Sequence, residues 1–254
     1  MRLLAAFVFA AMTAVPMGAA AQLKVMISGG FSGPFEKLVP IFEKEAGVKI
    51  TTLSGASQGT GPQTIGAQLA RGVPVDVVIL SREGLTDLAA QNCIAAGTDA
   101  DLARTPIGVA VKAGAPKPEV KSIEGFRKAL LAANLVAVPG STSGIFLMKE
   151  VFPRIGVEGK VKVEVTPRGA QAAQLVASGK ADLGLLPVSE IVHAPGVEVA
   201  GVIADEIQLN QVFAAAVVEG SSQAEAGKRL IAFLTSAQAA PTISAGGMEP
   251  LTRR

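Results

Sequence analysis

The chain has 254 residues, which is long enough for one large domain or two smaller ones. Its formal net charge of +2 provides no strong basic field, so composition argues against a nucleic acid or a membrane surface as the partner. Trp and Tyr are both absent, so the chain lacks the polar-tipped rings on which sugars and bases usually stack. These limits favour a small, non-aromatic ligand.

The N-terminus has the composition of a secretory signal. Arg2 precedes an apolar run over residues 3–15, and three alanines at 19–21 precede Gln22. The run is shorter than the ~20 residues that a membrane-spanning helix needs. We therefore expect residues 1–21 to be a signal peptide that is cleaved before Gln22 and that sends a soluble protein to the periplasm.

The first half of the chain alternates between strand and helix patterns. Apolar runs at 23–27, 48–53 and 75–80 predict strands. Helical spacing predicts helices over 34–46, where Pro40 should produce a bend, and over about 63–71. Regular alternation of this kind is typical of a mainly parallel sheet.

The pattern restarts after residue 104 and returns to the first sheet near the end. The expected strands are 107–112, 135–138, 161–165, 183–186 and 212–218, and the expected helices are 122–132, 145–152, 170–178 and 224–234. We predict an α/β protein of two Rossmann-like lobes with mainly parallel sheets: 22–104 with 205–254, and 105–204. The chain would cross between the lobes twice, which makes a hinge.

Three Ser- and Gly-rich turns follow expected strands, at 28–32, 54–61 and 140–144. Such turns aim backbone N–H groups and hydroxyls at one point, which suits an anion. Because open α/β sheets bind ligands at the carboxyl ends of their strands, we expect the turns to face one another across the hinge. Capping of helices and turns is the alternative role of these hydroxyls.

The chain resembles the periplasmic molybdate-binding proteins of ABC importers, within the type 2 periplasmic binding protein fold. The likeness lies in residues 25–47, 70–77, 143–146, 179–186 and 214–220, and it extends over nearly all of the mature chain. It implies a binding protein that closes over a small oxyanion or carboxylate and delivers it to a membrane permease.

In that family, hydroxyls, backbone N–H groups and a Tyr hold the oxyanion. Carried across, the first-turn Ser falls on Gly30, the central contact on Ser143, a later N–H on Gly169 and the Tyr on Pro187. Two contacts are thus missing, and Arg168 adds a fork of donors that suits a carboxylate. The opening of the first turn is also similar to a branch of the fold that includes aconitate isomerase.

The resulting candidate residues come from the three turns and from Arg168 with its neighbour. They are Ser28, Gly29, Gly30, Phe31, Ser32, Ser57, Gln58, Gly59, Thr60, Thr142, Ser143, Gly144, Arg168 and Gly169. We expect a monomer with no cofactor and no metal, since no residues have metal-ligand spacing.

Enzymatic alternatives have fewer residues to support them. A serine hydrolase is disfavoured because Thr142 stands where the nucleophile would, and the single His193 is expected in a loop. A phosphate loop at 55–61 lacks its Lys. An isomerase would need a proton-transferring base, for which Glu190, Asp76 or an activated Ser are the candidates. Cys93 is expected to be a buried residue at a helix end.

Overall fold

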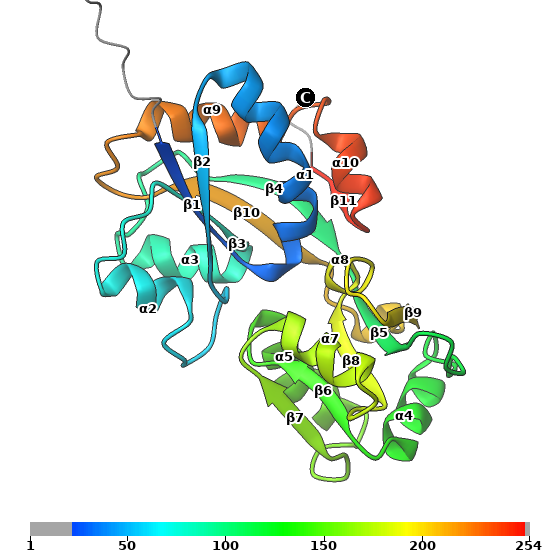
Figure 1. Ribbon diagram of the computed structural model, residues 1–254. Helices are drawn as coiled ribbons and strands as arrows, with labels where there is room; N and C mark the ends of the chain where they lie inside the picture. Colours follow the sequence, from blue (N-terminus) through cyan, green and yellow to red (C-terminus); the bar gives the residue numbers. More distant parts are fainter. Residues whose placement is uncertain (1–21, 252–254) are drawn as a thin grey trace, which may run out of the picture.

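The computed structural model describes residues 22–251, which form two α/β lobes joined at a narrow waist (Figure 1). The expected signal peptide at 1–21 lies outside the described residues. Among the helices of residues 22–251, none combines the length and the apolar character that crossing a membrane requires.

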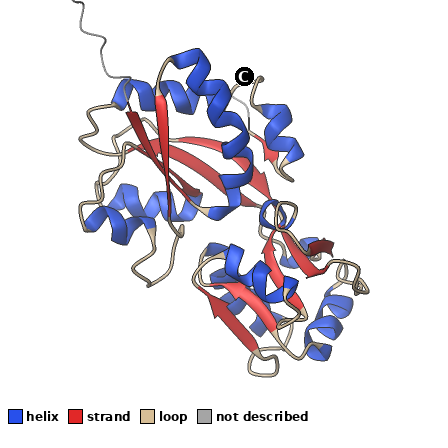
Figure 2. Cartoon of the chain, viewed as in Figure 1, coloured by secondary structure: helices blue, strands red, loops and turns tan. Residues whose placement is uncertain are grey.

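The larger lobe contains a six-stranded sheet in the order β11-β4-β10-β3-β1-β2. Its strands are β1 (Gln22–Ile27), β2 (Lys49–Ser54), β3 (Val77–Ser81), β4 (Ala100–Thr105), β10 (Gln211–Val217) and β11 (Glu249–Pro250). Its helices are α1 (Gly29–Ala46), α2 (Ile65–Ala70), α3 (Arg82–Ala90), α9 (Ala224–Leu234) and α10 (Ala240–Ala245). Figure 2 shows these helices on both faces of the sheet, so its central strands are buried on both sides.

The smaller lobe contains a five-stranded sheet in the order β7-β6-β8-β5-β9. Its strands are β5 (Ile107–Lys112), β6 (Val136–Pro139), β7 (Val163–Thr166), β8 (Leu183–Pro187) and β9 (Val197–Val202). Its helical segments are α4 (Ile123–Ala132), α5 (Thr142–Phe146), the π-helical turn η1 (Leu147–Val151), α6 (Phe152–Arg154), α7 (Gly169–Ala177), α8 (Val188–Ile191) and the 3₁₀ turn η2 (Asp205–Ile207).

The two-lobed α/β fold is confirmed, but both sheets are mixed rather than mainly parallel. β1 is parallel to β2 and β3, and β6 is parallel to β7 and β8. β10 is antiparallel to β3 and β4, and β5 is antiparallel to β8 and β9. A strand that enters a lobe from the hinge must run away from the cleft, so β5 and β10 oppose the neighbours that run toward it.

The chain crosses between the sheets twice, as expected. Pro106 separates β4 from β5, and residues 203–210 connect β9 to β10. On the return, Ile203 and Ile207 still pack in the core of the smaller lobe. The domain boundaries at 104/105 and 204/205 stay a prediction.

Local sequence signals explain where several helices begin and end. α1 follows Ser28 and ends at Gly47, whose φ of 65° lets its N–H reach the Glu43 carbonyl. α4 begins after Ser122, whose side chain accepts a 3.1 Å hydrogen bond from the Gly125 N–H. The helix expected over 145–152 instead starts at Thr142 and passes through η1 before Pro153, which has no N–H to continue an α-helix.

Candidate functional site

The three polar turns meet in the cleft between the lobes, and a small cavity lies where they converge. Ser28 follows β1, Ser57 follows β2, and Ser143 lies in the first turn of α5 after β6. We call this cavity the inner chamber. It is lined by Ser28, Gly29, Gly30, Gly55, Ala56, Ser57, Pro139, Ser141, Ser143, Arg168, Gly169, Glu190, Gln211 and Phe213.

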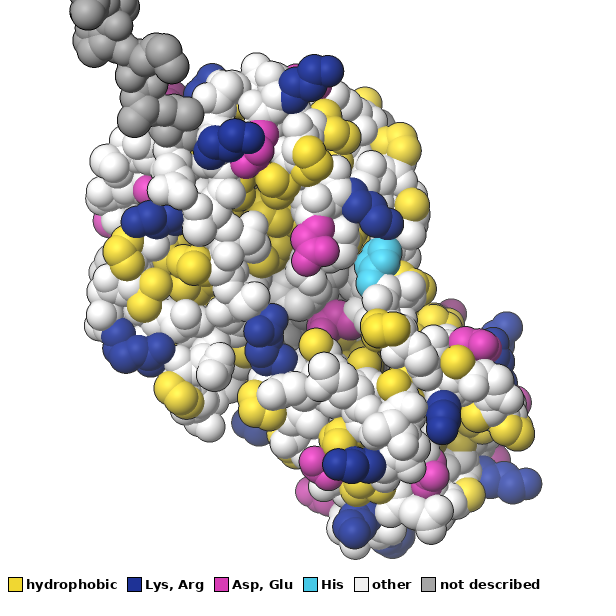
Figure 3. Space-filling model, viewed as in Figure 1, with side chains coloured by type: hydrophobic (Ala, Val, Ile, Leu, Met, Phe, Trp, Pro, Cys, Tyr) yellow, Lys and Arg dark blue, Asp and Glu magenta, His cyan; other side chains and the backbone are white. Residues whose placement is uncertain are grey.

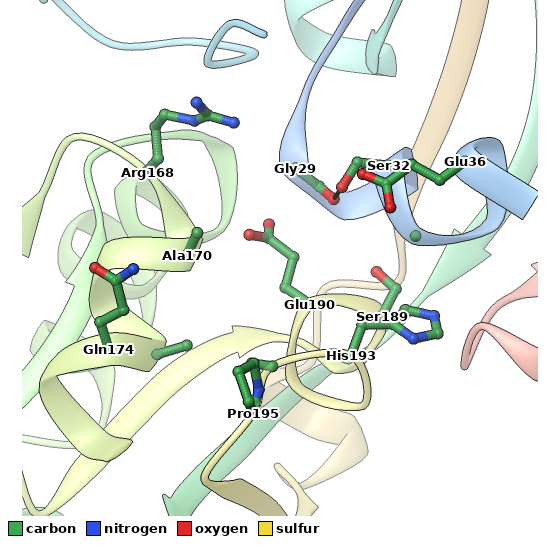
Figure 4. A pocket seen from close by; sticks show the side chains of 13 residues that line it. Gly29, Ser32, Glu36, Arg168, Ala170, Gln174, Ser189, Glu190, His193 and Pro195 are labelled. Carbon is green, nitrogen blue, oxygen red and sulfur yellow. Dashed lines mark hydrogen bonds between the residues drawn. The ribbon is translucent and has the colours of Figure 1, made fainter. Parts of the chain in front are cut away.

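A second, larger cavity of about 300 Å³ opens beside the inner chamber. We call it the outer chamber, and Figure 4 shows its side chains. It is lined by Gly29, Ser32, Gly33, Glu36, Arg168, Ala170, Ala173, Gln174, Ser189, Glu190, His193, Ala194 and Pro195. Gly29, Arg168 and Glu190 line both chambers, so these residues form the boundary between them.

Three buried polar atoms along these chambers have no hydrogen-bond partner within residues 22–251. They are Ser28 Oγ and Gln211 Oε1 in the inner chamber and Ser189 Oγ in the outer chamber. Each residue is no more than 4% exposed. A buried polar group without a partner costs about 1–3 kcal/mol, so these three atoms are candidates for hydrogen bonds to a bound ligand or to ordered water.

Arg168 presents its guanidinium to the cleft. Its backbone is extended and caps α7, with its N–H donating to Gln171 Oε1 at 3.1 Å. Figure 4 shows the side chain reaching across the cleft toward the side of Gly29. Within residues 22–251 the guanidinium forms no hydrogen bond and no ion pair, so its donor fork is free for an anionic group.

Glu190 is the ionisable group at the centre of the cleft. It lies on α8, and its carboxyl sits between Gly29, where α1 begins, and Gly169, where α7 begins. A methyl group at Gly169 would overlap the carboxyl, and one at Gly29 would lie 2.7 Å from Oε2. The absence of a side chain at these two positions lets the Glu190 carboxyl lie close to the starts of both helices.

Burial raises the pKa of Glu190 from its ordinary value of 4.5 to about 7, whereas the nearby Arg168 guanidinium acts to lower it. Desolvation is the larger effect, so the carboxyl is poised to take up and release a proton near neutral pH.

Phe213 explains one missing family contact. A methyl group at Gly30 would overlap the Phe213 ring, which lines the inner chamber from β10. The hydroxyl that the resemblance implied at this position therefore has no room here. Position 187, where the resemblance implied a Tyr, is the Pro that precedes α8.

The structure brings together part of the expected site. Ser28, Gly29, Gly30, Ser57, Ser143, Arg168 and Gly169 all line the inner chamber. Ser32 lines the outer chamber instead, and its hydroxyl donates to the Gly29 carbonyl at 2.7 Å. Whether these residues bind a ligand remains a prediction.

The other expected residues lie outside both chambers. The Phe31 side chain is fully buried in the core of the larger lobe, and Gly144 packs against the Pro139 carbonyl. Gln58, Gly59 and Thr60 line a separate hollow beside Ile145 and Lys149.

Thr142 joins the two lobes. Its hydroxyl lies 2.8 Å from Ser81 Oγ and donates to Gln58 Oε1 at 3.0 Å. Ser81 and Gln58 belong to the larger lobe, whereas Thr142 belongs to the smaller one. We call this group of Gln58, Ser81 and Thr142 the interlobe contact.

Of the other residues considered in the sequence, Asp76 and Cys93 lie away from the chambers and His193 lines the outer one. Asp76 lies before β3, at the end of the sheet away from the cleft, and accepts hydrogen bonds from Lys24 N and Ser221 Oγ. His193 follows α8 and lines the outer chamber; partial burial and Lys37 lower its pKa, while Glu36 opposes them. Cys93 is half-buried, three residues past the end of α3.

Sequence reasoning did not single out Gln211, Ser189 or Phe213 as site residues, and it included Ser141 only as part of the 140–144 turn. Gln211 begins an apolar strand at the hinge, and a lone Gln at a strand end carries no signal of binding. Among residues 22–251, no group of three His, Cys, Asp or Glu side chains is arranged to hold a metal ion.

Two α/β lobes with a polar cleft between them, and a hinge of two crossings, define the class of two-lobed solute-binding proteins. The chain belongs to the bacterial extracellular solute-binding protein family, whose model matches residues 23–249. Among curated proteins, it is 35% identical over 231 residues to an aconitate isomerase of a Pseudomonas species. The aligned residues cover 90% of this chain and 88% of that protein.

Solved structures of similar fold include proteins named for oxyanions. The periplasmic molybdate-binding protein of Azotobacter vinelandii matches with a TM-score of 0.70 at 20% identity, covering 91% of this chain and 100% of that one. The sulfate-binding protein of Mycobacterium tuberculosis matches with a TM-score of 0.70 at 18% identity, covering 91% and 88%. These likenesses show the shared fold.

Proposed function

We propose that this protein is a periplasmic aconitate isomerase, which interconverts cis- and trans-aconitate. The observation that carries the proposal is Glu190, a carboxyl with a pKa of about 7 that lies in the cleft beside an unpaired Arg168. The relative that is 35% identical over most of both chains bears the name of this activity, which supports the choice of reaction.

The reaction itself asks for one group that can both remove and return a proton. Aconitate has a methylene carbon that carries one carboxylate and is attached to the carbon–carbon double bond. Removal of a methylene proton breaks a C–H bond and spreads the electron pair over the allylic carbons and the attached carboxylates. Return of a proton to the formerly vinylic carbon shifts the double bond and allows the other geometry to form, with every atom and electron conserved.

Glu190 suits the proton-transfer role because a base works best when its pKa lies near the working pH. The ionised carboxylate would accept the methylene proton, and the resulting acid would deliver a proton to the other end of the allylic system. It needs no partner residue to reset it, since each turnover returns the carboxyl to its ionised form.

Arg168 and the hydroxyls of the inner chamber suit the second requirement, the stabilisation of negative charge. Proton removal adds one negative charge to a substrate that already carries carboxylates, so preorganised donors would lower the barrier. The Arg168 fork, Ser28 and Ser143 are the candidate donors, and Gln211 presents an amide from the hinge. This role stays a proposal for each of them.

The direct test is turnover by the purified mature chain. We expect the ultraviolet absorbance of trans-aconitate to change with time, and proton NMR to show cis-aconitate as the product. In deuterated water the product should gain deuterium at carbon if Glu190 exchanges its proton with solvent between the two steps. Tight binding of aconitate without any conversion would reject the isomerase.

A binding protein that serves an ABC importer is the second candidate, because the free donors of Arg168 and Ser28 suit capture of a small anion without chemistry. Its expected partner is a membrane permease, and it would bind without turnover. Calorimetric titration with molybdate, tungstate, sulfate and citrate-like acids separates the two candidates. For either function, N-terminal sequencing of the secreted protein should find Gln22 as the first residue.

A further inference from the structure

The geometry points to a site in two parts, in which one carboxylate of the ligand occupies the inner chamber and a second occupies the outer chamber. The ligand class is therefore an elongated polycarboxylate and not a single tetrahedral oxyanion. The inference rests on the proposed function, since it assigns the two ends of the same ligand, but it concerns binding and is tested without turnover.

The volumes of the two chambers support this division. The inner chamber is about 20 Å³, which is little more than the room needed by one water-sized group. The outer chamber, at about 300 Å³, has the size of a small-molecule site. A tricarboxylate of six carbons cannot enter the inner chamber whole, so most of its length must lie in the outer one.

Each chamber is lined by at least one residue with an unpartnered buried polar atom. Ser28 Oγ and Gln211 Oε1 belong to residues of the inner chamber, and Ser189 Oγ belongs to a residue of the outer chamber. A single small oxyanion in the inner chamber would leave the Ser189 hydroxyl without a partner. A ligand with one polar group in each chamber would provide partners for both sets.

The residues shared by the chambers fix what lies between the two ends. Arg168 and Glu190 line both cavities, and Figure 4 shows both side chains directed into the space between the lobes. A ligand that spans the chambers would carry its middle carbons past the Glu190 carboxyl. This placement brings the methylene carbon, rather than a terminal carboxylate, to the proton-accepting group.

The negative charge of Glu36 gives a way to detect a carboxylate in the outer chamber. Glu36, an exposed residue of α1, lines the outer chamber together with His193. A carboxylate in the outer chamber would be repelled by Glu36, whereas an anion confined to the inner chamber would feel it weakly through solvent. The Glu36→Gln variant should therefore bind a polycarboxylate more tightly.

The test compares two probes by titration calorimetry on the mature protein. Tricarballylate is a saturated tricarboxylate that lacks the double bond and cannot be isomerised, and sulfate is a single tetrahedral anion. We expect tricarballylate to bind at least 100-fold more tightly than sulfate. Equal affinity for the two, or no binding of tricarballylate, overturns the inference.

Two variants, Ala170→Leu and Glu36→Gln, test whether the outer chamber contributes to tricarballylate affinity. Ala170→Leu adds bulk at an exposed residue of α7 that lines only this chamber, and should weaken tricarballylate at least tenfold. Ala89→Leu, at an exposed residue of α3 outside both chambers, is the matched control and should change nothing. Glu36→Gln should tighten tricarballylate about two- to fivefold, a gain that misfolding cannot produce.

The two-chamber site is rejected if the tricarballylate affinity of Ala170→Leu lies within twofold of the wild-type value, or if Glu36→Gln fails to increase that affinity. Thermal unfolding of each variant checks that the fold is intact. Failure of the isomerase would be seen separately, as the absence of aconitate turnover in a protein that still shows the two-chamber pattern. Conversely, if the protein turns over aconitate but Ala170→Leu does not change its affinity for tricarballylate, the isomerase is supported and the two-chamber site is rejected.

Discussion

Two groups of polar side chains lie in the same cleft, and they are used differently. In the interlobe contact, the Thr142 hydroxyl forms hydrogen bonds with both Ser81 and Gln58 and so joins the two lobes. In the chambers, Ser28 Oγ and Gln211 Oε1 are equally buried but have no partner within residues 22–251. Residue type alone does not separate the groups, because both contain Ser and Gln.

The two groups differ in whether their polar atoms have hydrogen-bond partners in the protein. A satisfied pair contributes about 1 kcal/mol to stability, whereas a buried group without a partner costs a comparable amount or more. The interlobe contact therefore stabilises the lobes against each other in the absence of ligand. In the chambers, hydrogen bonds to a ligand could offset the cost of the unpartnered groups, and for this reason we propose them as the binding site. Figure 3 shows acidic, basic and His side chains gathered around the hollow between the lobes.

The largest expected effect is on turnover. Glu190→Gln keeps the shape of the side chain but removes the proton acceptor, so we expect aconitate turnover to fall by about 10²–10⁴-fold. Affinity for tricarballylate should be kept or improved, because a negative charge leaves the cleft. The control is Glu150→Gln, at an exposed position of η1. Full activity in Glu190→Gln would remove this residue from the chemistry.

The next largest expected effect is the loss of ligand affinity when the Arg168 guanidinium is replaced. Arg168→Lys keeps the positive charge but loses the paired N–H groups, and we expect tricarballylate affinity to fall about 10–100-fold, or about 1–3 kcal/mol. Arg127→Lys on α4 lies outside both chambers and should have no effect. If Arg168→Lys binds normally, the guanidinium is a surface charge and the chambers lose their main cation.

The pH dependence of stability tests whether Glu190 is as poorly solvated as its position implies. Its pKa is raised from 4.5 to about 7 in the folded protein, so between these pH values the folded state holds a proton that the unfolded chain releases. The free energy of unfolding should therefore fall as pH rises from 4.5 to 7, by about 1–2 kcal/mol after allowance for solvent.

Denaturant unfolding of the wild type and Glu190→Gln at several pH values measures this contribution. The variant cannot titrate at this position, so the difference between the two curves isolates Glu190 from the other carboxylates. Parallel curves across pH 4.5–7 would mean that the carboxyl is well solvated. The protonation argument for catalysis would then lose its basis.

The smallest effect compares the two groups directly, through one serine from each. Ser81→Ala removes a hydroxyl that bonds Thr142 and also caps α3 through the Gly84 N–H, so stability should fall by about 1 kcal/mol or more. Ser28→Ala removes a buried hydroxyl without a partner, so stability should stay the same or rise slightly. Tricarballylate affinity should fall in Ser28→Ala.

Thermal unfolding and calorimetry on Ser81→Ala and Ser28→Ala test whether the two serines have different roles. A stability loss in Ser28→Ala equal to that in Ser81→Ala would show that the two hydroxyls have the same structural role. An unchanged affinity in Ser28→Ala would show that the inner chamber does not hold the ligand through this residue.

Much of the fold could be predicted from the sequence because its signals are local. Apolar runs located β1, β6 and β10, and the cap at Ser122 located the start of α4. The three polar turns could be placed at strand ends for the same reason, since each turn adjoins its strand in the chain. The antiparallel placement of β5 and β10 could not be predicted, because it depends on the hinge through which each strand enters its sheet.

The amino-acid sequence supplies the hydroxyls and other hydrogen-bond donors of the cleft, but the packing of the two lobes determines which of them lack a protein partner. Thr142 and Ser143 are neighbours in the chain, yet one is bonded across the lobes and the other lines the inner chamber. Gln211 and Glu190 line the inner chamber because the hinge and α8 bring them to the polar turns. Hydrogen-bond satisfaction and desolvation depend on everything within a few ångströms, and most of those neighbours are distant along the chain.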